Sequence, residues 1–292
     1  MTDVIQHRLR PFGQLDLHQQ PAQSLHVVLA QGRGSTVNVP AHWMSVCGTI
    51  RGRVCLQSMG REWALEAGHC QLWGNGALQC RASEAHGWLL IAAPREVWPT
   101  AQRRDPAESL LSPWQDRISR DLARVLIAAA RVDNSRVDTL YARSHEVGAA
   151  LIDSIARQQV DLHGLLERCA GRTRHLRQQT MSRLLRVRHA ILCDPGQRQD
   201  LDQLATLANY SPCHLLRMHR RVFGETPFEY ASRLRDRRAL ELLRSTDLSV
   251  LDISLRLGFE SQSAFCRAFK LSFGATPTDM RRDALQCTPR AA

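Results

Sequence analysis

Two stretches in the last third of the chain carry hydrogen-bond donors at matching positions. Arg217 and Arg267 lie fifty residues apart, and Gln262 shortly precedes Arg267. A guanidinium group can donate to the O6 and N7 atoms of guanine, and a glutamine amide can pair with adenine. This chemistry reads base edges in the major groove of duplex DNA, so each stretch must lie on an exposed helix.

The first turns of two such helices supply the predicted base-reading positions. They are Pro212, Cys213, Leu216 and Arg217 in the first helix, and Gln262, Ser263, Ala264 and Arg267 in the second. One turn further, Arg220, Arg221 and Lys270 can reach the phosphate backbone. A solvated charged face, without any contact to phosphate, is the alternative for these three residues.

An internal repeat supports this pairing of the two stretches. Six residue identities recur at an offset of fifty: Ser211/Ser261, Arg217/Arg267, Phe223/Phe273, Gly224/Gly274, Thr226/Thr276 and Pro227/Pro277. Before them, similar residues recur at an offset of forty-nine, such as Leu204 with Ile253 and Tyr210 with Phe259. One residue has therefore been added in a turn while the flanking helices keep their register.

Each copy has the layout of a helix-turn-helix unit. Asn209 or Gly258 can take the left-handed conformation that ends a short helix. Ser211 or Ser261 can cap the second helix, and both serines belong to the predicted DNA-binding set. A single helix over residues 228–245 would join the copies, and a helix over residues 181–192 would precede them. The sequence thus predicts seven helices in about one hundred residues.

Residues 182–282 resemble the DNA-binding domain of the AraC/XylS family of transcription regulators. The stretches that carry the resemblance are LATLANYSPCHLLRMHRRVFGETPFEY and ISLRLGFESQSAFCRAFKLSFGATPTDMRR. Two unrelated helix pairs would not place Arg, Phe-Gly and Thr-Pro at a constant offset. The resemblance implies binding to double-stranded DNA, RNA polymerase as a partner, and activation as the commoner outcome.

The composition agrees with binding to DNA but does not show where on the chain DNA would bind. The 292 residues suggest about two domains. The net charge is +11, and Lys270 is the only lysine among 39 basic residues; the arginine bias has genomic base composition as an alternative origin. The sequence contains neither a membrane-length apolar run nor a signal peptide, so we expect a cytoplasmic protein with no membrane contact.

The first part of the chain predicts a different architecture. Residues 1–98 read as short strands separated by glycine-bearing turns, and they hold five of the six tryptophans. They resemble in outline the cupin-like sensor barrel that many AraC/XylS members carry. The whole chain is therefore predicted to be α+β: residues 1–98 form the barrel, 99–166 dimerising helices, 167–179 a linker, and 180–285 the all-α DNA-binding domain.

Two helical stripes after the predicted barrel suggest a homodimer. The apolar spacing over residues 114–130 and 137–157 is that of one helical face. The stripes are Leu122, Val125, Leu126 and Ala129 in the first helix, and Leu140, Val147, Leu151 and Ile155 in the second. Packing of both stripes within one monomer is the alternative.

The predicted barrel is expected to sense an effector, whose identity and binding residues the sequence does not give. The competing hypothesis is a cupin-type metal enzyme fused to a DNA-binding tail. A cupin metal site needs a His-x-His strand, but Trp43 and Met44 follow His42, while His69 and His86 stand apart. We therefore expect neither an enzyme nor a cofactor, and no metal site.

Nine cysteines are expected to be thiols, because the chain is predicted to be cytosolic. No CxxC pair supports structural zinc. Cys47, Cys55, Cys70 and Cys80 are concentrated in the predicted barrel. One interpretation of this concentration is a sensor of oxidants or soft metals. The favoured interpretation is that these cysteines are small buried side chains of the core.

Overall fold

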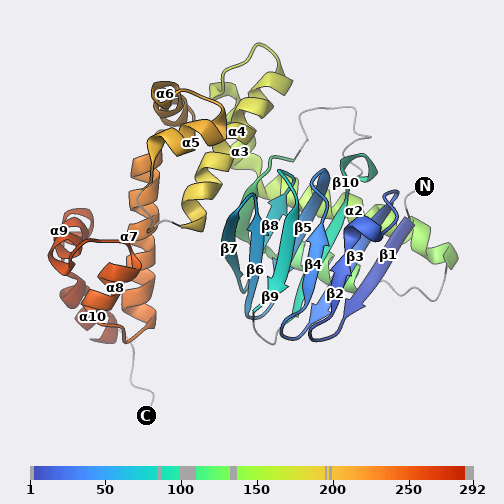
Figure 1. Cartoon of the computed structure of the whole chain (residues 1–292), viewed down its shortest axis with the longest axis horizontal. Coiled ribbons are helices and arrows are strands. Elements are labelled where there is room, and N and C mark those ends of the chain that lie inside the picture. Colours follow the sequence, from blue (N-terminus) through green and yellow to red (C-terminus); the bar gives the residue numbers. More distant parts are fainter. Residues whose placement is uncertain are drawn as a thin grey trace. The chain divides into compact units, whose positions relative to one another are not determined.

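The computed structural model describes residues 3–83, 87–98, 110–131, 137–194, 196 and 199–286. The chain divides into two compact units, Met1–Arg186 and Val187–Ala292. Figure 1 shows strands backed by helices toward the N-terminus and helices alone toward the C-terminus. The fold is therefore α+β, as the sequence predicted.

The N-terminal unit contains two β-sheets. The first has six strands in the order β1 (Asp3–Leu9), β3 (Ser24–Gln31), β10 (Gly87–Pro94), β5 (Trp43–Thr49), β8 (His69–Trp73) and β11 (Trp114–Arg117). The second has five strands in the order β2 (Gln14–Asp16), β4 (Thr36–Val39), β9 (Leu78–Ala82), β6 (Arg53–Ser58) and β7 (Arg61–Glu66). Strands β1 and β3 pair in parallel, whereas β5 pairs antiparallel with β8 and β10.

The two sheets pack as a sandwich. At one edge, Nε1 of Trp63 on β7 donates to Oε1 of Gln71 on β8 across 3.0 Å, and both side chains are buried. Between the described strands the sheets remain separate and do not close into a barrel. This double-sheet form is one of the ways in which cupins avoid open strand edges, so it agrees with the predicted cupin-like architecture.

Strand sequences explain which sheet is covered on both faces. Strand β6 alternates buried Val54 and Leu56 with exposed Arg53 and Gln57, because its outer face meets water. Strand β5 is buried along its whole length. Its second face is covered by α1 (Arg120–Ala130) and α2 (Val137–Gln158), which pack against the six-stranded sheet. Figure 1 shows α2 behind this sheet.

Much of both predicted dimerisation stripes faces this core. The stripe residues buried there are Leu122, Leu126, Ala129, Leu151 and Ile155. Val125 is partly buried against the same cluster. The side chains of Leu140 and Val147 lie outside the described residues.

The predicted helical face over residues 114–130 is wrong in its first turn. Trp114–Arg117 forms strand β11, which pairs with β8 so that Trp114 lies opposite Leu72. The helix begins at Arg120, where the Ser119 hydroxyl accepts from the Leu122 amide across 3.2 Å. Pairing with a distant strand satisfies the backbone hydrogen-bonding groups of these residues. The local spacing of apolar residues contains no information about that strand.

The predicted linker at residues 167–179 is partly helical. Beyond α3 (Val160–Gly164), a short turn η5 covers Leu166–Arg168, and α4 spans Arg174–Cys193. The Thr180 hydroxyl donates to the Ala170 carbonyl across 2.9 Å. Within the predicted linker, only residues 169–173 therefore lie outside a helix or helical turn.

Helices α4 to α10 give the seven helices that the sequence predicted. After α4 they are α5 (Leu201–Ala208), α6 (Pro212–Phe223), α7 (Pro227–Ser245), α8 (Val250–Arg256), α9 (Gln262–Phe273) and α10 (Pro277–Gln286). Leu242 and Leu243 of α7 pack with Ile253, Phe265 and Phe269 of the second copy. Among the described residues, we find no helix with the length and apolar character that crossing a bilayer would need.

Candidate nucleic-acid interface

The first helix-turn-helix unit consists of α5 and α6. Asn209 ends α5 with φ 51°, in the left-handed region. The Ser211 hydroxyl then accepts from the His214 amide across 3.4 Å, and Pro212 occupies the first helical position of α6. Gly224 ends α6 with φ 77°. The predictions for Asn209 and Ser211 are confirmed.

The second unit repeats this construction in α8 and α9. Gly258 takes the left-handed conformation with φ 75°. The Ser261 hydroxyl accepts from the Ala264 amide across 3.1 Å, and Gly274 ends α9 with φ 74°. The two units thus present helices of equal length, each with 12 residues.

The Phe-Gly-x-Thr-Pro strings stop each second helix and start the next one. Thr226 and Glu229 form a reciprocal capping box, in which the Glu229 amide donates to Thr226 Oγ1 at 3.2 Å and the Thr226 amide donates to Glu229 Oε2 at 2.6 Å. In the second copy, Asp279 takes the place of Glu229, and its amide donates to Thr276 Oγ1 across 3.2 Å. A left-handed glycine, a capping threonine and a proline suited to the first helical position explain this motif.

The inner faces of α6 and α9 fix how each helix is seated. Leu215, Met218 and Val222 are buried on α6, and Phe265 and Phe269 are buried on α9. Ala268, on the same face of α9, is only partly buried. The two phenylalanines are therefore what α9 contributes to the buried core that also contains Leu242, Leu243 and Ile253.

The predicted DNA-contact residues lie on the opposite, accessible side of both helices. Those that are exposed are Ser211, Cys213, Arg217, Arg220, Arg221, Ser261, Gln262, Ser263, Arg267 and Lys270. Pro212, Leu216 and Ala264 are partly exposed. Each helix thus exposes uncharged side chains near its start and positively charged side chains further along.

Two predicted contact residues of α6 already have partners in the protein. Nη2 of Arg217 donates to Nδ1 of His214 across 3.1 Å. Nη2 of Arg220 donates to Oε1 of Glu229 across 2.7 Å, in an exposed ion pair. His214 was absent from the sequence-based site, although its place three residues before Arg217 puts the two side chains on one helix face.

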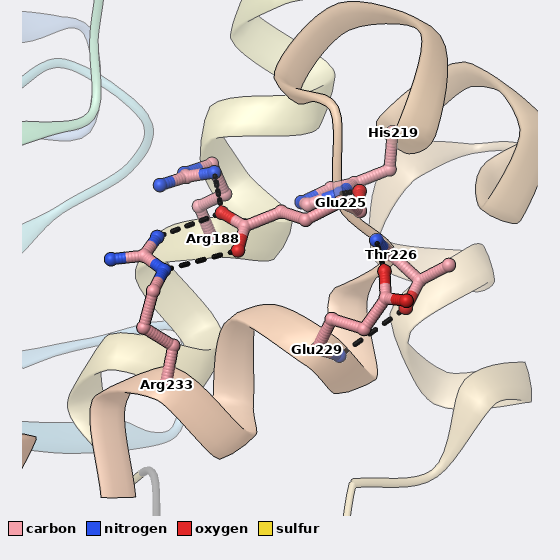
Figure 2. A network of polar contacts seen from close by, with 6 residues as sticks. All are labelled: Arg188, His219, Glu225, Thr226, Glu229 and Arg233. Carbon is pink, nitrogen blue, oxygen red and sulfur yellow. Dashed lines mark hydrogen bonds and ion pairs between the residues drawn. The ribbon is translucent and has the colours of Figure 1, made fainter. Parts of the chain in front are cut away.

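A polar network joins the end of α6 to α4 and α7 (Figure 2). The Glu225 carboxylate accepts from Arg188 of α4 at 3.1 Å and from two nitrogens of Arg233 of α7 at 2.7 and 3.1 Å. The Arg188 guanidinium also lies over the Tyr230 ring, 3.8 Å from its centroid. Burial raises the pKa of Glu225, but the hydrogen bonds and charges of Arg233 and Arg188 outweigh burial and hold this pKa below its usual value.

His219 lies beside this network and was also missed by sequence analysis. It occupies the position that Phe269 has in the second copy, and it is fully buried. Its Nδ1 atom donates to the Glu225 carbonyl across 2.6 Å. Burial, assisted by the charge of Arg188, lowers the pKa of His219 to about 4. The repeat alignment carried the signal, since a histidine stands where the other copy has a core phenylalanine.

The cysteines of the sandwich have the character of core residues. Cys47, Cys70 and Cys80 are buried, and Cys55 is partly buried. Burial is the main cause that raises the pKa of Cys70 to about 12 and the pKa of Cys55 to about 11. Thiolates, not thiols, are the reactive species, so these environments favour packing over sensing.

The histidines that a cupin metal site would need are scattered. His42 is exposed beyond β4, His69 starts β8, and His86 lies outside the described residues. Within the part of the chain that the structure describes, no group of three His, Cys, Asp or Glu residues could hold a metal ion.

The match to a known protein family lies in the C-terminal unit, Val187–Ala292. A family described as a helix-turn-helix domain matches residues 204–283. The probable transcription factor PqrA of Proteus vulgaris is 39% identical over 83 residues, which are 28% of this chain and 68% of PqrA. The transcriptional activator AarP of Providencia stuartii is 37% identical over 81 residues, 28% of this chain and 60% of AarP.

A solved structure is similar in sequence to about a third of this chain. The C-terminal domain of AraT, a response regulator from Geobacillus stearothermophilus, is 32% identical, covering 35% of this chain and 84% of that domain, with a TM-score of 0.33. This chain spans less than two thirds of AarP, and the match to PqrA leaves most of this chain uncovered.

Proposed function

Because this chain belongs to the AraC/XylS family of transcription regulators, we propose that it binds specific sequences in double-stranded DNA and regulates transcription there. One observation carries the proposal: α6 and α9 are built alike, each capped by serine at its start, seated on a buried apolar face, and exposing an arginine at the repeated position. A helix presented in this way fits the major groove.

Base readout is assigned to the predicted positions of the two helices. Arg217 and Arg267 donate to guanine, and Gln262 pairs with adenine. The remaining members are Pro212, Cys213 and Leu216 on α6, and Ser263 and Ala264 on α9, with Ser211 and Ser261 at the helix starts. Their support is that they are exposed or partly exposed near the starts of two capped helices.

Phosphate contact is assigned to Arg221, Lys270 and Arg220. All three are exposed and follow the reading arginines by about one turn. Arg220 bonds to Glu229, so it reaches phosphate only by sharing or leaving this partner. We therefore rank Arg221 as the main phosphate ligand of α6.

The N-terminal unit is proposed to sense a small-molecule effector and to support a homodimer. The sandwich of residues 1–98 takes the sensor role, residues 99–166 the pairing role, and residues 180–285 the DNA-binding role. The core-facing stripes of α1 and α2 favour packing within one monomer, whereas Ile127 of α1 is 45% exposed and available for pairing. Because its named relatives are bacterial regulators and AarP is an activator, we further propose activation through RNA polymerase, in the cytoplasm.

Selection of duplexes tests this function directly. The full chain is incubated with a randomised duplex pool, and the bound sequences are enriched and identified. The proposed function requires a defined sequence. Arg217→Ala and Arg267→Ala should each weaken binding to that duplex by about 5- to 100-fold, and binding to random duplex much less. Equal losses on both duplexes would reassign the arginines to phosphate, and failure to enrich any sequence would reject the function.

A separate measurement addresses the enzyme hypothesis. The relatives named above are transcription factors, so none of them supports a metal enzyme fused to a DNA-binding tail. Metal analysis of the purified chain discriminates the two hypotheses further: a stoichiometric metal ion would favour the enzyme.

A further inference from the structure

Arg217 and Arg267 occupy matching positions of the repeat, but their surroundings differ. Three residues before Arg217 stands His214, whereas three residues before Arg267 stands Ala264. Arg217 therefore has a side-chain acceptor at 3.1 Å on its own helix. Among the described residues, the Arg267 side chain has neither a hydrogen bond nor an ion pair.

The hydrogen bond between His214 and Arg217 requires one particular tautomer of the neutral imidazole. A guanidinium group has only donors, so Nδ1 of His214 must be the acceptor and must carry no proton. A neutral imidazole then holds its single hydrogen on Nε2. A doubly protonated ring would turn two donors toward each other and lose the contact.

The imidazole is itself held in place by the turn between α5 and α6. Its ring lies against that of Tyr210, with 4.6 Å between centroids and a tilt of 58°. Tyr210 follows the left-handed Asn209, and the His214 amide donates to the capping Ser211. A chain of contacts thus runs from the turn, through Tyr210 and His214, to the guanidinium of Arg217.

From this asymmetry we propose that His214 is a positioning residue of the first reading helix. It holds the flexible Arg217 side chain in one orientation before DNA arrives, so that less conformational freedom is lost when the arginine donates to its base. Discrimination at that base then depends on the pair His214–Arg217, whereas Arg267 reads its base without such support. This inference rests on the proposed function.

The test uses a fluorescein-labelled duplex that the full chain has selected from a randomised pool. Fluorescence anisotropy gives Kd for this duplex and for a random duplex. It also gives Kd for duplexes altered at one base pair, namely the pair at which the Arg217→Ala variant no longer prefers one base over another. His214→Ala should raise Kd for the selected duplex roughly 2- to 10-fold, as expected for loss of one hydrogen bond. It should reduce discrimination at that base pair by a similar factor and leave Kd for the random duplex unchanged.

The conservative variant separates positioning from a general effect on folding. The amide oxygen of glutamine can also accept from a guanidinium group, so His214→Gln should restore part of the lost discrimination. Thermal unfolding followed by circular dichroism serves as a control, and both His214 variants should unfold at temperatures near that of the unaltered chain.

A double-mutant cycle gives the decisive result, and the repeat supplies its matched control. In an Arg217→Ala background, His214→Ala should have no further effect; in an Arg267→Ala background, it should keep its full effect. An equal effect in both backgrounds, or an equal loss on random duplex, would overturn the inference and make His214 a DNA contact in its own right. If the full chain selects no duplex, the proposed function itself fails.

Discussion

The Nδ1 atom of His219 donates to the carbonyl oxygen of Glu225 across 2.6 Å, which joins the middle of α6 to the turn that follows this helix. The Glu225 side chain is held at the same time by Arg188 and Arg233. Glu225 thus receives hydrogen bonds from three helices, α4, α6 and α7, at the end of α6 (Figure 2). The orientation of α6 should therefore depend on this network.

Stability should fall in mild acid because of His219. Its pKa is about 4 in the folded chain, against 6.5 for an ordinary histidine. Below pH 6.5 the unfolded chain therefore binds a proton that the folded chain refuses, so stability present above pH 6.5 is lost as the pH falls toward 4. The full loss from this group is about 3 kcal/mol.

His219→Phe tests this pH dependence, because phenylalanine occupies the matching position 269. Urea unfolding between pH 7 and pH 4.5 should show a smaller loss of stability in the variant than in the unaltered chain. A parallel loss in both proteins would show that His219 is not the titrating group. His175→Phe at an exposed position is the control and should keep the original pH dependence.

Glu225→Gln should destabilise the C-terminal unit by about 1–3 kcal/mol, because a neutral amide cannot balance the two guanidinium groups. The Glu225 and Arg188 side chains are only 20% and 21% exposed. The matched control is Glu241→Gln, which removes an ion pair whose side chains are about half exposed and should cost less than about 0.5 kcal/mol. Thermal unfolding of both variants is the measurement, and equal shifts would contradict the role of Glu225.

Arg221→Ala should lower the slope of log Kd against log salt by about one unit, on the selected and on random duplexes alike. Arg220→Ala should lower it less, because Glu229 already partly neutralises Arg220. Titrations at several salt concentrations measure both slopes. An unchanged slope for Arg221→Ala would return this residue to the solvated surface.

A fragment of residues 173–292 should fold alone and bind the selected duplex more weakly than the full chain does. It keeps α4 entire and both helix-turn-helix cores, and a lost second reader would lower the effective concentration of the first. Circular dichroism and anisotropy are the measurements. An unfolded fragment, or one that binds as tightly as the full chain, would contradict this division of roles.

The sequence by itself determined the two helix-turn-helix units, because their signals are local. The left-handed Asn209 and Gly258 and the capping Ser211 and Ser261 act on backbone within a few residues of themselves. The internal repeat supported each of these predictions, because the same type of signal occurs at the matching position of the other copy. These local features of the two helix-turn-helix units could be predicted residue by residue.

Only the tertiary structure decided the contacts whose partners are far apart in the chain. Strand β11 depends on pairing with β8, which lies more than forty residues earlier, and Glu225 depends on Arg188 of α4. The His214–Arg217 contact is short in sequence, but the imidazole that makes it also packs against Tyr210 of the preceding turn. Periodicity reports which face of an element is buried, but it does not identify the partner on the other side; long-range packing selects that partner.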